Sequence, residues 1–337
     1  MTRNTKIWFN RGFSLAPIAG LMRAADPLLD VYVSVSSQSS HYVGPTETWI
    51  DGGDTDPDDA EAYVDWVRET ITANEIVIFI PTRRRKAIAA ANLPCHVHFP
   101  TDVDTLAILD DKFEFANAIA SEDYHLPTYL AQGADDLETI LRNWSNEAGP
   151  CVKPRNGVNG LGFWRLMDVS PVAHLQDSER RRIRPEQYLS AVRDQEQRGP
   201  IDDIVVMPYL PGPEISFDIL VDHGRMLKYA ARTKLGTGRQ HIVSKHPLEQ
   251  IVETIVDKFK LHGVVNAQFR RADDESWVLL EINARPAGGV VYADQVGCRL
   301  IADWSGLLTG RLTPETIDRS NIDTEVAFST VVRPIAA

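Results

Sequence analysis

The chain has 337 residues, enough for about two domains at roughly 150 residues each. Hydrophobic residues make up 43% and charged residues 24%, which argues against a disordered chain. The formal net charge of −12 argues against a general binder of nucleic acid or of anionic membranes, because both are polyanions. We therefore expect small-molecule partners, with no nucleic acid and no membrane.

The cysteines and the apolar segments indicate the compartment. Cys95, Cys151 and Cys298 are far apart and have no CxxC spacing, so a zinc finger or a disulfide framework is a poor interpretation. No signal-peptide core follows the N-terminus, and no apolar run approaches the roughly 18 residues of a membrane span. We predict a cytoplasmic protein, in which Cys151 is packed rather than catalytic.

The first hundred residues alternate between strand and helix patterns. A helix capped by Ser14 is expected to end at Ala25, and a second is expected over 60–73. Short apolar or β-branched runs predict strands over 6–10, 31–35 and 75–80. This order is typical of a small parallel sheet covered by helices, so we predict an α/β domain that ends near residue 100.

Three polar segments of this region leave alternatives open. Seven acidic residues and no basic one lie between Asp51 and Asp65, which favours a solvated loop before a helix over a calcium loop. Residues 83–86, Arg-Arg-Arg-Lys, open a helix; they form a solvated helix start or dock an anionic substrate. His96 and His98 share a strand face, but without a third ligand we interpret them as packing or surface histidines.

The pattern changes in the rest of the chain. Residues 105–130 are predicted to be largely helical, and from 150 onward short strands are separated by Gly-rich turns, which indicates a mostly antiparallel α+β domain. The charged segment 176–200 is predicted to be helical through Arg180–Arg182, as a solvated face or an insertion. The predicted strands are 151–153, 163–166, 204–207, 215–221, 226–232, 264–270 and 277–282.

Two of these strands carry oxygen ligands. The segments 264–270 and 278–283 alternate apolar and polar residues, and the turn-like 271–276 between them predicts a hairpin. Because side chains two residues apart share a face, Glu281 points the same way as Asn283. The same reasoning groups Asn266, Gln268 and Arg270, and the hairpin brings Gln268 opposite Glu281 within one register step. Carboxylate and amide oxygens suit Mg²⁺, although the solvent face of a half-buried hairpin would alternate too.

A second motif joins a lysine to glycines. Lys153 ends a strand, and Asn156, Gly157, Gly160 and Gly162 follow before the next strand. Glycines let a backbone approach phosphate oxygens, and lysine supplies a mobile charge. No GK[ST] follows, and no helix opens after the last glycine, so this is neither a Walker loop nor a dinucleotide fingerprint. An ordinary hairpin turn is the alternative.

A third motif is a proline-rich crossover. The hydrophobic strand that ends at Met207 runs into residues 208–213, and the next strand opens with Glu214. A flat base could lie against such a backbone, and Glu214 could accept hydrogen bonds from ribose hydroxyls. A purely structural connection is the alternative.

Taken in order, these motifs resemble the ATP-grasp superfamily, in the style of the ATP-binding halves of carbamoyl phosphate synthetase and of small bacterial ATP-grasp ligases. The resemblance covers roughly 105–310, and 1–100 resembles the α/β domain that usually precedes it. It implies an α/β N-terminal domain followed by an α+β ATP-grasp fold whose two subdomains clamp ATP. The implied division is 1–100, a small subdomain with linker helices over 101–205, and a large subdomain with the metal site over 206–337.

The resemblance also implies roles for individual residues. Lys112 and Lys153 match the two nucleotide-binding lysines, and the segment from Asn156 to Gly162 matches the glycine loop over the phosphates. The segment 281–289 is very close to the family pattern E-x-N-x-R-x-x-G-G. The remaining matches are Met207, Tyr209 and Leu210 in the hinge that holds adenine, Glu214 on the ribose, Gln268, Glu281 and Asn283 on the metal, and Arg285 on phosphate. The implied cofactors are ATP and Mg²⁺, with Mn²⁺ as a substitute.

By this resemblance the chain is similar to ATP-dependent carboxylate–amine ligases, which form an acylphosphate and release ADP and phosphate. The acid would be an amino acid or a small carboxylic acid. Lys153 and Arg285 would stabilise charge, and Arg232 would read the acid with help from Lys234 and Arg239, unless that loop is merely solvated. A kinase or a nucleotide-binding regulatory protein is the alternative, and intact metal positions argue against the regulatory protein. Relatives are often dimers, so a homodimer stays open.

Overall fold

The computed structural model describes residues 4–10, 16–35, 47–50, 59–157, 160–236, 238–319 and 321–327. The chain divides into two compact units. Unit 1 comprises Met1–Thr105, Ser216–Ala267 and Asn283–Ala337, and unit 2 comprises Leu106–Ile215 and Gln268–Ile282. The division at residues 100 and 205 that we expected from the sequence stays a prediction. In the described ranges no helix is long and apolar enough to cross a membrane.

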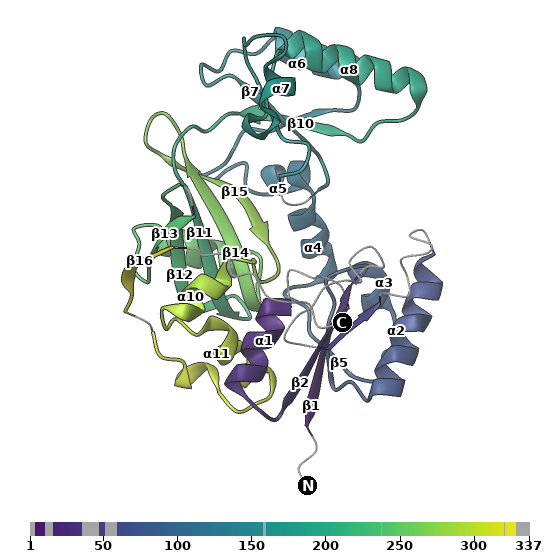
Figure 1. Cartoon of the computed structure of the whole chain (residues 1–337), viewed down its shortest axis with the longest axis vertical. Coiled ribbons are helices and arrows are strands. Elements are labelled where there is room, and N and C mark those ends of the chain that lie inside the picture. The colour runs from purple at the N-terminus through teal and green to yellow at the C-terminus, as the bar shows by residue number, and fades with distance from the viewer. Residues whose placement is uncertain are drawn as a thin grey trace. The chain divides into compact units, whose positions relative to one another are not determined.

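Unit 1 contains the parallel sheet predicted for the first hundred residues (Figure 1). Its strand order is β3-β2-β1-β4-β5, and each neighbouring pair is parallel. The strand-helix alternation produces this because a parallel neighbour needs a crossover connection. The strands are β1 (Thr5–Phe9), β2 (Leu29–Val35), β3 (Glu47–Ile50), β4 (Ile78–Ile80) and β5 (His96–Val97).

Three helices connect these strands: α1 (Ala16–Ala25), α2 (Ala60–Asn74) and α3 (Arg85–Ala90). The side chain of Asp59 caps α2 by accepting a hydrogen bond from the Ala62 amide at 2.8 Å. The alternate faces of β1 are both buried: Ile7 and Phe9 pack with α1, whereas Trp8 stacks on Phe79 at 4.7 Å between ring centroids. Ser14 and residues 51–58 lie outside the described residues.

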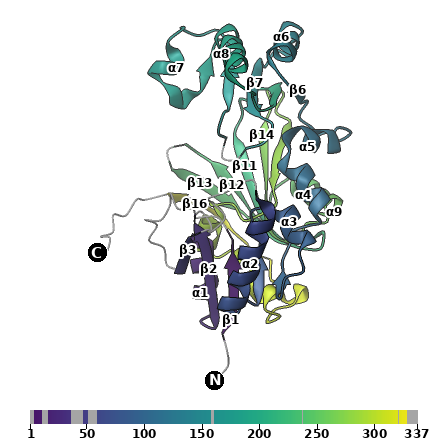
Figure 2. The ribbon, with the colours of Figure 1, turned by 90° about the vertical axis from the view of Figure 1, so that its right-hand side faces the viewer.

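Unit 1 also holds most of a six-stranded sheet in the order β15-β14-β11-β12-β13-β16, seen beside its helices in Figures 1 and 2. Pairs β12–β13 and β13–β16 are antiparallel, as expected for this half of the chain. The border between the units cuts through β11, β14 and β15. The strands are β11 (Glu214–Asp222), β12 (Arg225–Lys234), β13 (Arg239–Val243), β14 (Gly263–Arg271), β15 (Trp277–Asn283) and β16 (Asp323–Ala327), and the helices are α9 (Glu249–Lys258), α10 (Val290–Gln295), α11 (Leu300–Leu308) and the 3₁₀ turn η5 (Pro314–Thr316).

Unit 2 is built on a second five-stranded sheet in the order β6-β10-β7-β8-β9. Helices α6 and α8 pack on it through Leu137 and Val192, which join a core with Val152 and Val206 (Figure 1). The strands are β6 (Tyr129–Ala131), β7 (Pro150–Pro154), β8 (Trp164–Leu166), β9 (Arg182–Ile183) and β10 (Ile204–Pro208), and the helices are α4 (Val103–Asp110), α5 (Lys112–Ala118), α6 (Ala134–Arg142), α7 (Ala173–Gln176), η4 (Ser178–Arg180) and α8 (Pro185–Arg198).

Two local predictions were wrong. The strand expected from Glu75 begins at Ile78, because Glu75 has φ 56° and closes α2 as its left-handed cap. The helix expected through Arg180–Arg182 is absent: Arg181 has φ 49°, which ends a 3₁₀ turn, and β9 starts at Arg182. The stretch 105–130 holds α4 and α5 and then leads to β6 at Tyr129. Asp111 separates the two helices, because its side chain caps α5 by accepting hydrogen bonds from the amides of Phe113 and Glu114.

Candidate nucleotide and metal site

The glycine motif connects two antiparallel strands of unit 2, as the sequence predicts. Strand β7 carries Lys153, and β8 pairs with β7 through Cys151 opposite Arg165. Gly160 and Gly162 have φ values of 64° and 72°, in the left-handed region that favours glycine. A Cβ on Gly162 would lie 2.6 Å from the ring of Pro154, so the loop returns tightly across its own start. The Nζ of Lys153 lies 5.7 Å from the ring centroid of Phe163.

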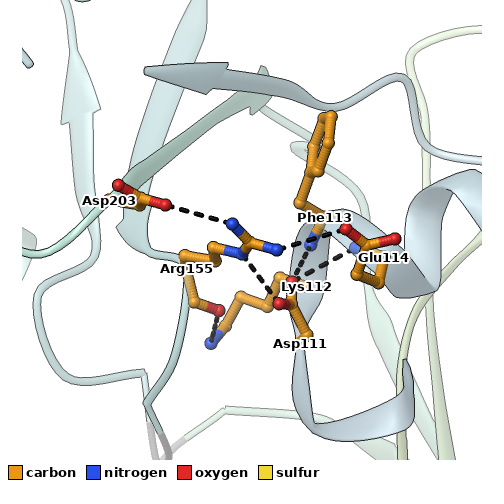
Figure 3. Close-up of polar contacts among 6 residues, drawn as sticks. All are labelled: Asp111, Lys112, Phe113, Glu114, Arg155 and Asp203. Carbon is orange, nitrogen blue, oxygen red and sulfur yellow. Dashed lines mark hydrogen bonds and ion pairs between the residues drawn. The ribbon is translucent and has the colours of Figure 1, made fainter. Parts of the chain in front are cut away.

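The side chain of Arg155 makes ion pairs at the start of this loop (Figure 3). Arg155 directly follows β7, and its guanidinium contacts Asp111 at 2.7 Å, Asp203 at 3.1 Å and Glu114 at 3.2 Å. Hydrogen bonds to Asp203 and Asp111 raise the pKa of Arg155, so it stays charged. The Arg155 amide also donates to the carbonyl oxygen of Asp203 at 2.7 Å. Arg155 therefore fixes where the glycine loop leaves the sheet.

Lys112 also lies at the start of the glycine loop, because it is the first residue of α5 and follows Asp111, which contacts Arg155 (Figure 3). Its Nζ donates to the carbonyl oxygens of Gly157 at 3.0 Å and Arg155 at 3.3 Å. Burial lowers the pKa of Lys112, as does the charge of Lys153, whereas Glu281 and Asp111 raise it. Lys153 and Glu281, which are far from Lys112 in sequence, are thus near enough to Lys112 in unit 2 for their charges to act on it. Lys112 and Lys153 are also the two lysines of unit 2.

The proline-rich crossover is held by arginines. Strand β10 pairs with β7 through Val205 opposite Lys153, so the crossover begins beside the lysine strand. The ring of Tyr209 has the guanidinium of Arg165 at 3.9 Å and that of Arg270 at 5.7 Å from its centroid. Arg270 also donates to the Gly212 carbonyl oxygen at 3.1 Å and lies 4.0 Å from the Glu214 carboxylate. The predicted hinge and the predicted ribose acid therefore share one arginine.

Met207 and Leu210, the other predicted hinge residues, are buried. They belong to a cluster with Cys151 and Val278, which packs β10 and β7 against the β15 side of unit 2. Cys151 is 3% exposed, and burial raises the pKa of its thiol to about 11, which confirms that it is packed.

The β14–β15 hairpin has the predicted turn, closed by the Ala272 amide donating to the Ser276 carbonyl oxygen at 2.9 Å. Gln268 and Glu281 are half-buried in unit 2, and Asn283 is half-buried where unit 1 resumes, while Ile282 between them is buried. Glu281 and Asn283 therefore share the less buried face of β15. This donor set of one carboxylate and two amides fits a hard cation such as Mg²⁺. The register that puts Gln268 opposite Glu281 stays a prediction.

Arg285 follows β15 in a tight turn. Its amide donates to the carbonyl oxygen of Asn283 at 2.8 Å, and its side chain donates to the carbonyl oxygen of Pro286 at 3.3 Å. The E-x-N-x-R segment is therefore bent back on itself just after the strand. Its contact with phosphate stays a prediction.

Arg232 is buried in unit 1 and belongs to a polar cluster. It is 5% exposed, and its guanidinium makes two hydrogen bonds to the fully buried Asp218, at 2.5 and 3.2 Å. Gln240 accepts from Arg232 at 2.9 Å, and Asn266 donates to Asp218 at 2.9 Å. A Cβ on Gly289 would collide with the guanidinium, so this glycine provides the room for it. Lys234 and Arg239 are exposed, and Arg239 pairs with Glu325.

The arginine run and the histidine pair are both placed in unit 1. Arg83 and Arg84 each lie 5.2 Å from the ring centroid of Tyr63, whose hydroxyl accepts from the buried side chain of Asn10 at 3.0 Å. The run opens α3, as predicted. His98 is buried, as the packing interpretation predicts, whereas His96 is exposed.

Sequence reasoning missed Arg155, Asp203 and Arg165. Arg155 stands in the glycine motif itself, where its charge beside Lys153 was the available signal. Asp203 and Arg165 gave no signal, because they reach their partners only through the pairing of β10 and β8 with β7.

The fold is that of ATP-grasp proteins. The structure resembles an L-amino acid ligase from Bacillus licheniformis, with a TM-score of 0.62 and 17% identity over 94% of this chain and 78% of that one. It resembles an N5-carboxyaminoimidazole synthetase from Staphylococcus aureus, with a TM-score of 0.63 and 12% identity over 97% and 82% of the two chains. It also resembles a biotin carboxylase from Campylobacter jejuni, with a TM-score of 0.63 and 13% identity over 95% of this chain and 74% of that one.

The sequence itself matches a family model over residues 200–331. That family is described as ATP-grasp in the biosynthetic pathway with Ter operon. No curated protein sequence matches the chain significantly. The resemblance to the ATP-grasp superfamily and the predicted fold class are confirmed.

Proposed function

We propose that this chain is an ATP-dependent, ADP-forming carboxylate–amine ligase. The observation that carries the proposal is the gathering of Lys112, Lys153 and Glu281 in unit 2, at the start of a glycine loop. Two lysines beside a carboxylate, with half-buried amides along the same hairpin, suit a nucleotide whose phosphates are shared between cations. Structures with the same fold include an L-amino acid ligase and a carboxylase domain in complex with MgADP.

The residues would act mainly by positioning and by charge. Gln268, Glu281 and Asn283 would hold Mg²⁺, or Mn²⁺ in its place. When bound, the ion would neutralise charge on the phosphates. Lys153 and Arg285 would stabilise the charge that spreads over the transferring phosphoryl group.

Other residues would bind the nucleotide and exclude water. Asn156, Gly157, Gly160 and Gly162 would cover the phosphates and protect an acylphosphate from hydrolysis. Met207, Tyr209 and Leu210 would hold the base, and Glu214 the ribose. Arg165 and Arg270 keep the Tyr209 ring in place for this role.

In the proposed reaction, a carboxylate oxygen of the acid attacks the γ-phosphorus, and the bond to the ADP oxygen breaks. The amine nitrogen then attacks the acyl carbon, loses a proton, and phosphate leaves. Arg232 would contribute to the acid site, although its side chain is held by Asp218 and Gln240. Lys234 and Arg239, which are exposed, would help to read the acid, although Arg239 pairs with Glu325.

A product assay tests this function. Full-length protein with Mg·ATP is incubated with amino acids and small carboxylates, alone and in pairs, and ADP, AMP and phosphate are measured. We expect ADP and free phosphate in equal amounts, and only with a particular acid–amine pair. Formation of ADP without free phosphate would indicate a kinase instead. Formation of AMP would contradict acylphosphate chemistry, and the absence of any product with every pair would favour a regulatory protein.

Glu281→Ala provides the matched test of the metal site. We expect it to abolish this turnover while the fold persists, because Glu281 is half-buried on a strand face. Glu275→Ala removes the same charge from the exposed turn of the same hairpin and should keep full turnover. Retained turnover of Glu281→Ala at saturating Mg²⁺ would refute the metal assignment.

A further inference from the structure

A group of metal-ligating side chains lies in unit 1 around the turn between β11 and β12. Asp222 is the last residue of β11, His223 and Gly224 form the turn, and His262 precedes β14. The candidate ligand atoms of Asp222, His223 and His262 all lie within 4.8 Å of one another. A tetrahedral ion with bonds of about 2.0–2.1 Å holds its ligand atoms roughly 3.4 Å apart. To bind one ion, these atoms would draw closer and the His223 ring, which is stacked on His262, would turn.

Two of the candidate ligand atoms lie close to each other. The Nδ1 of His262 lies 3.7 Å from Oδ1 of Asp222, close to the separation that a tetrahedral ion needs. The backbone amide of His223 donates to the same Nδ1 at 3.3 Å, so this nitrogen carries a lone pair and no proton in the neutral ring. This lone pair is also the one that an ion would use, so metal binding would replace the His223 amide as its partner. The bound cation would then lie beside the Asp222 carboxylate, whose Oδ1 is already close to Nδ1.

His223, the third candidate ligand, lies in the turn between β11 and β12. The rings of His223 and His262 are stacked, with centroids 3.9 Å apart and planes 8° apart. His223 has φ 45° and Gly224 φ 87°, so this is a two-residue hairpin turn in which asparagine would be the ordinary first residue. Histidine, like asparagine, is among the residues enriched at positive φ, so this turn accommodates it. Its ring is exposed, so it can turn toward an ion.

The backbone around the group is fixed by hydrogen bonds. The Gly224 amide donates to the Leu261 carbonyl oxygen at 2.7 Å, and the His262 amide donates to the Pro100 carbonyl oxygen at 2.6 Å. The ring centroid of the buried His98 lies 4.9 Å from that of His262. Oδ2 of Asp222 is 3.7 Å from Arg225, which leaves Oδ1 toward the histidines. Three segments of unit 1 are thus held together before any ion binds.

We propose that Asp222, His223 and His262 form a binding site for a divalent transition-metal ion such as Zn²⁺. Two imidazoles and one carboxylate are ligands that Zn²⁺ and its neighbours prefer, whereas Mg²⁺ takes oxygen ligands. The site shares no residue with the proposed nucleotide site and does not depend on the proposed function. The ion would join the β11–β12 turn to the segment that leads into β14.

Spectroscopic titration of the full-length protein tests the site. Chelator-treated protein is titrated with Co²⁺ in excess Mg²⁺, the visible absorption of the bound ion is recorded, and Zn²⁺ is added in competition. We expect about one equivalent of Co²⁺ that Zn²⁺ displaces, and a rise in melting temperature with Zn²⁺. His223→Asn keeps a residue that this turn favours and removes the ring, so we expect it to fold and to bind at least about tenfold more weakly.

The controls separate this site from other metal binding. Asp222→Asn should weaken binding as His223→Asn does. His241→Gln removes a histidine of β13 that contacts Asp323 instead, and Glu281→Gln removes the proposed magnesium ligand; both should bind Co²⁺ like the unaltered chain. The proposal is overturned if the unaltered chain binds no Co²⁺, or if His223→Asn and Asp222→Asn keep its affinity. Loss of binding in Glu281→Gln would equally overturn it, by assigning the ion to the nucleotide site.

Discussion

Replacement of Asp218 by asparagine would test whether the Arg232 cluster stabilises unit 1. Asp218 is fully buried and Arg232 is 5% exposed, so neither charge can be solvated if its partner is lost. Asp218→Asn keeps the shape and an oxygen for the guanidinium, but it removes the negative charge that pairs with this buried positive charge. Gln240 and Asn266, which also bond to the pair, carry no charge.

The expected loss follows from the burial of both partners. Breaking a buried ion pair costs about 3–5 kcal/mol, and the retained amide oxygen places this substitution near about 3 kcal/mol. For a unit of about 210 residues, each kcal/mol lowers the melting temperature by roughly 2–4 °C, so a fall of about 6–12 °C is expected. Urea denaturation followed by circular dichroism should show the same loss as an earlier midpoint.

An exposed ion pair of the same sheet provides the control. Arg239 and Glu325 are both more than half exposed, so Glu325→Gln should change stability by less than about 1 kcal/mol. If Asp218→Asn were no more destabilising than Glu325→Gln, the buried cluster would not stabilise unit 1, and the burial argument would be refuted.

Two further predictions concern unit 2 and the thiols. Gly162→Ala should destabilise the chain by about 1–3 kcal/mol in urea, because the residue has φ 72° and its Cβ would meet Pro154; Gly199→Ala, with no atom within 4 Å of its Cβ, should change stability by less than about 1 kcal/mol. Burial raises the pKa values of Cys95 and Cys151 to about 11, so about 0.1% of each is thiolate at pH 8, and iodoacetamide should label them far more slowly in native than in urea-unfolded protein. Equal labelling rates, measured by mass spectrometry, would contradict the burial of these thiols.

The sequence predicted those features whose signals are local. The strands predicted around Lys153 and Glu281 are confirmed. They were predictable because the alternation of apolar and polar residues and the glycine turns specify hairpins over a few residues. The helix start at Ala60 was predictable because α2 follows an aspartate that caps it. The errors at Glu75 and Arg181 share one cause: both residues adopt left-handed backbone, which ends an element at residues that are not glycine.

Features that depend on pairing of distant segments were not predictable. Asp218 and Arg232 lie on β11 and β12, whose central residues are buried on both faces, so no alternation marks an inward-facing charge. Likewise, His98 lacked a visible partner in the sequence, since His262 lies more than 160 positions away. For Asp218 and Arg232, the available signal in the sequence was a charged residue within a strand that is otherwise largely apolar.

Calorimetric titration with Mg·ADP tests the central claim most directly, namely that Lys153 and its neighbours bind a nucleotide. Removing one charged hydrogen-bonding partner of a phosphate costs about 1.5–3 kcal/mol, so Lys153→Ala should bind Mg·ADP roughly 10- to 150-fold more weakly than the unaltered chain. Lys245→Ala, which removes an exposed lysine of unit 1, should bind as the unaltered chain does. Equal affinity of Lys153→Ala and the unaltered chain, or no binding by either, would contradict the account.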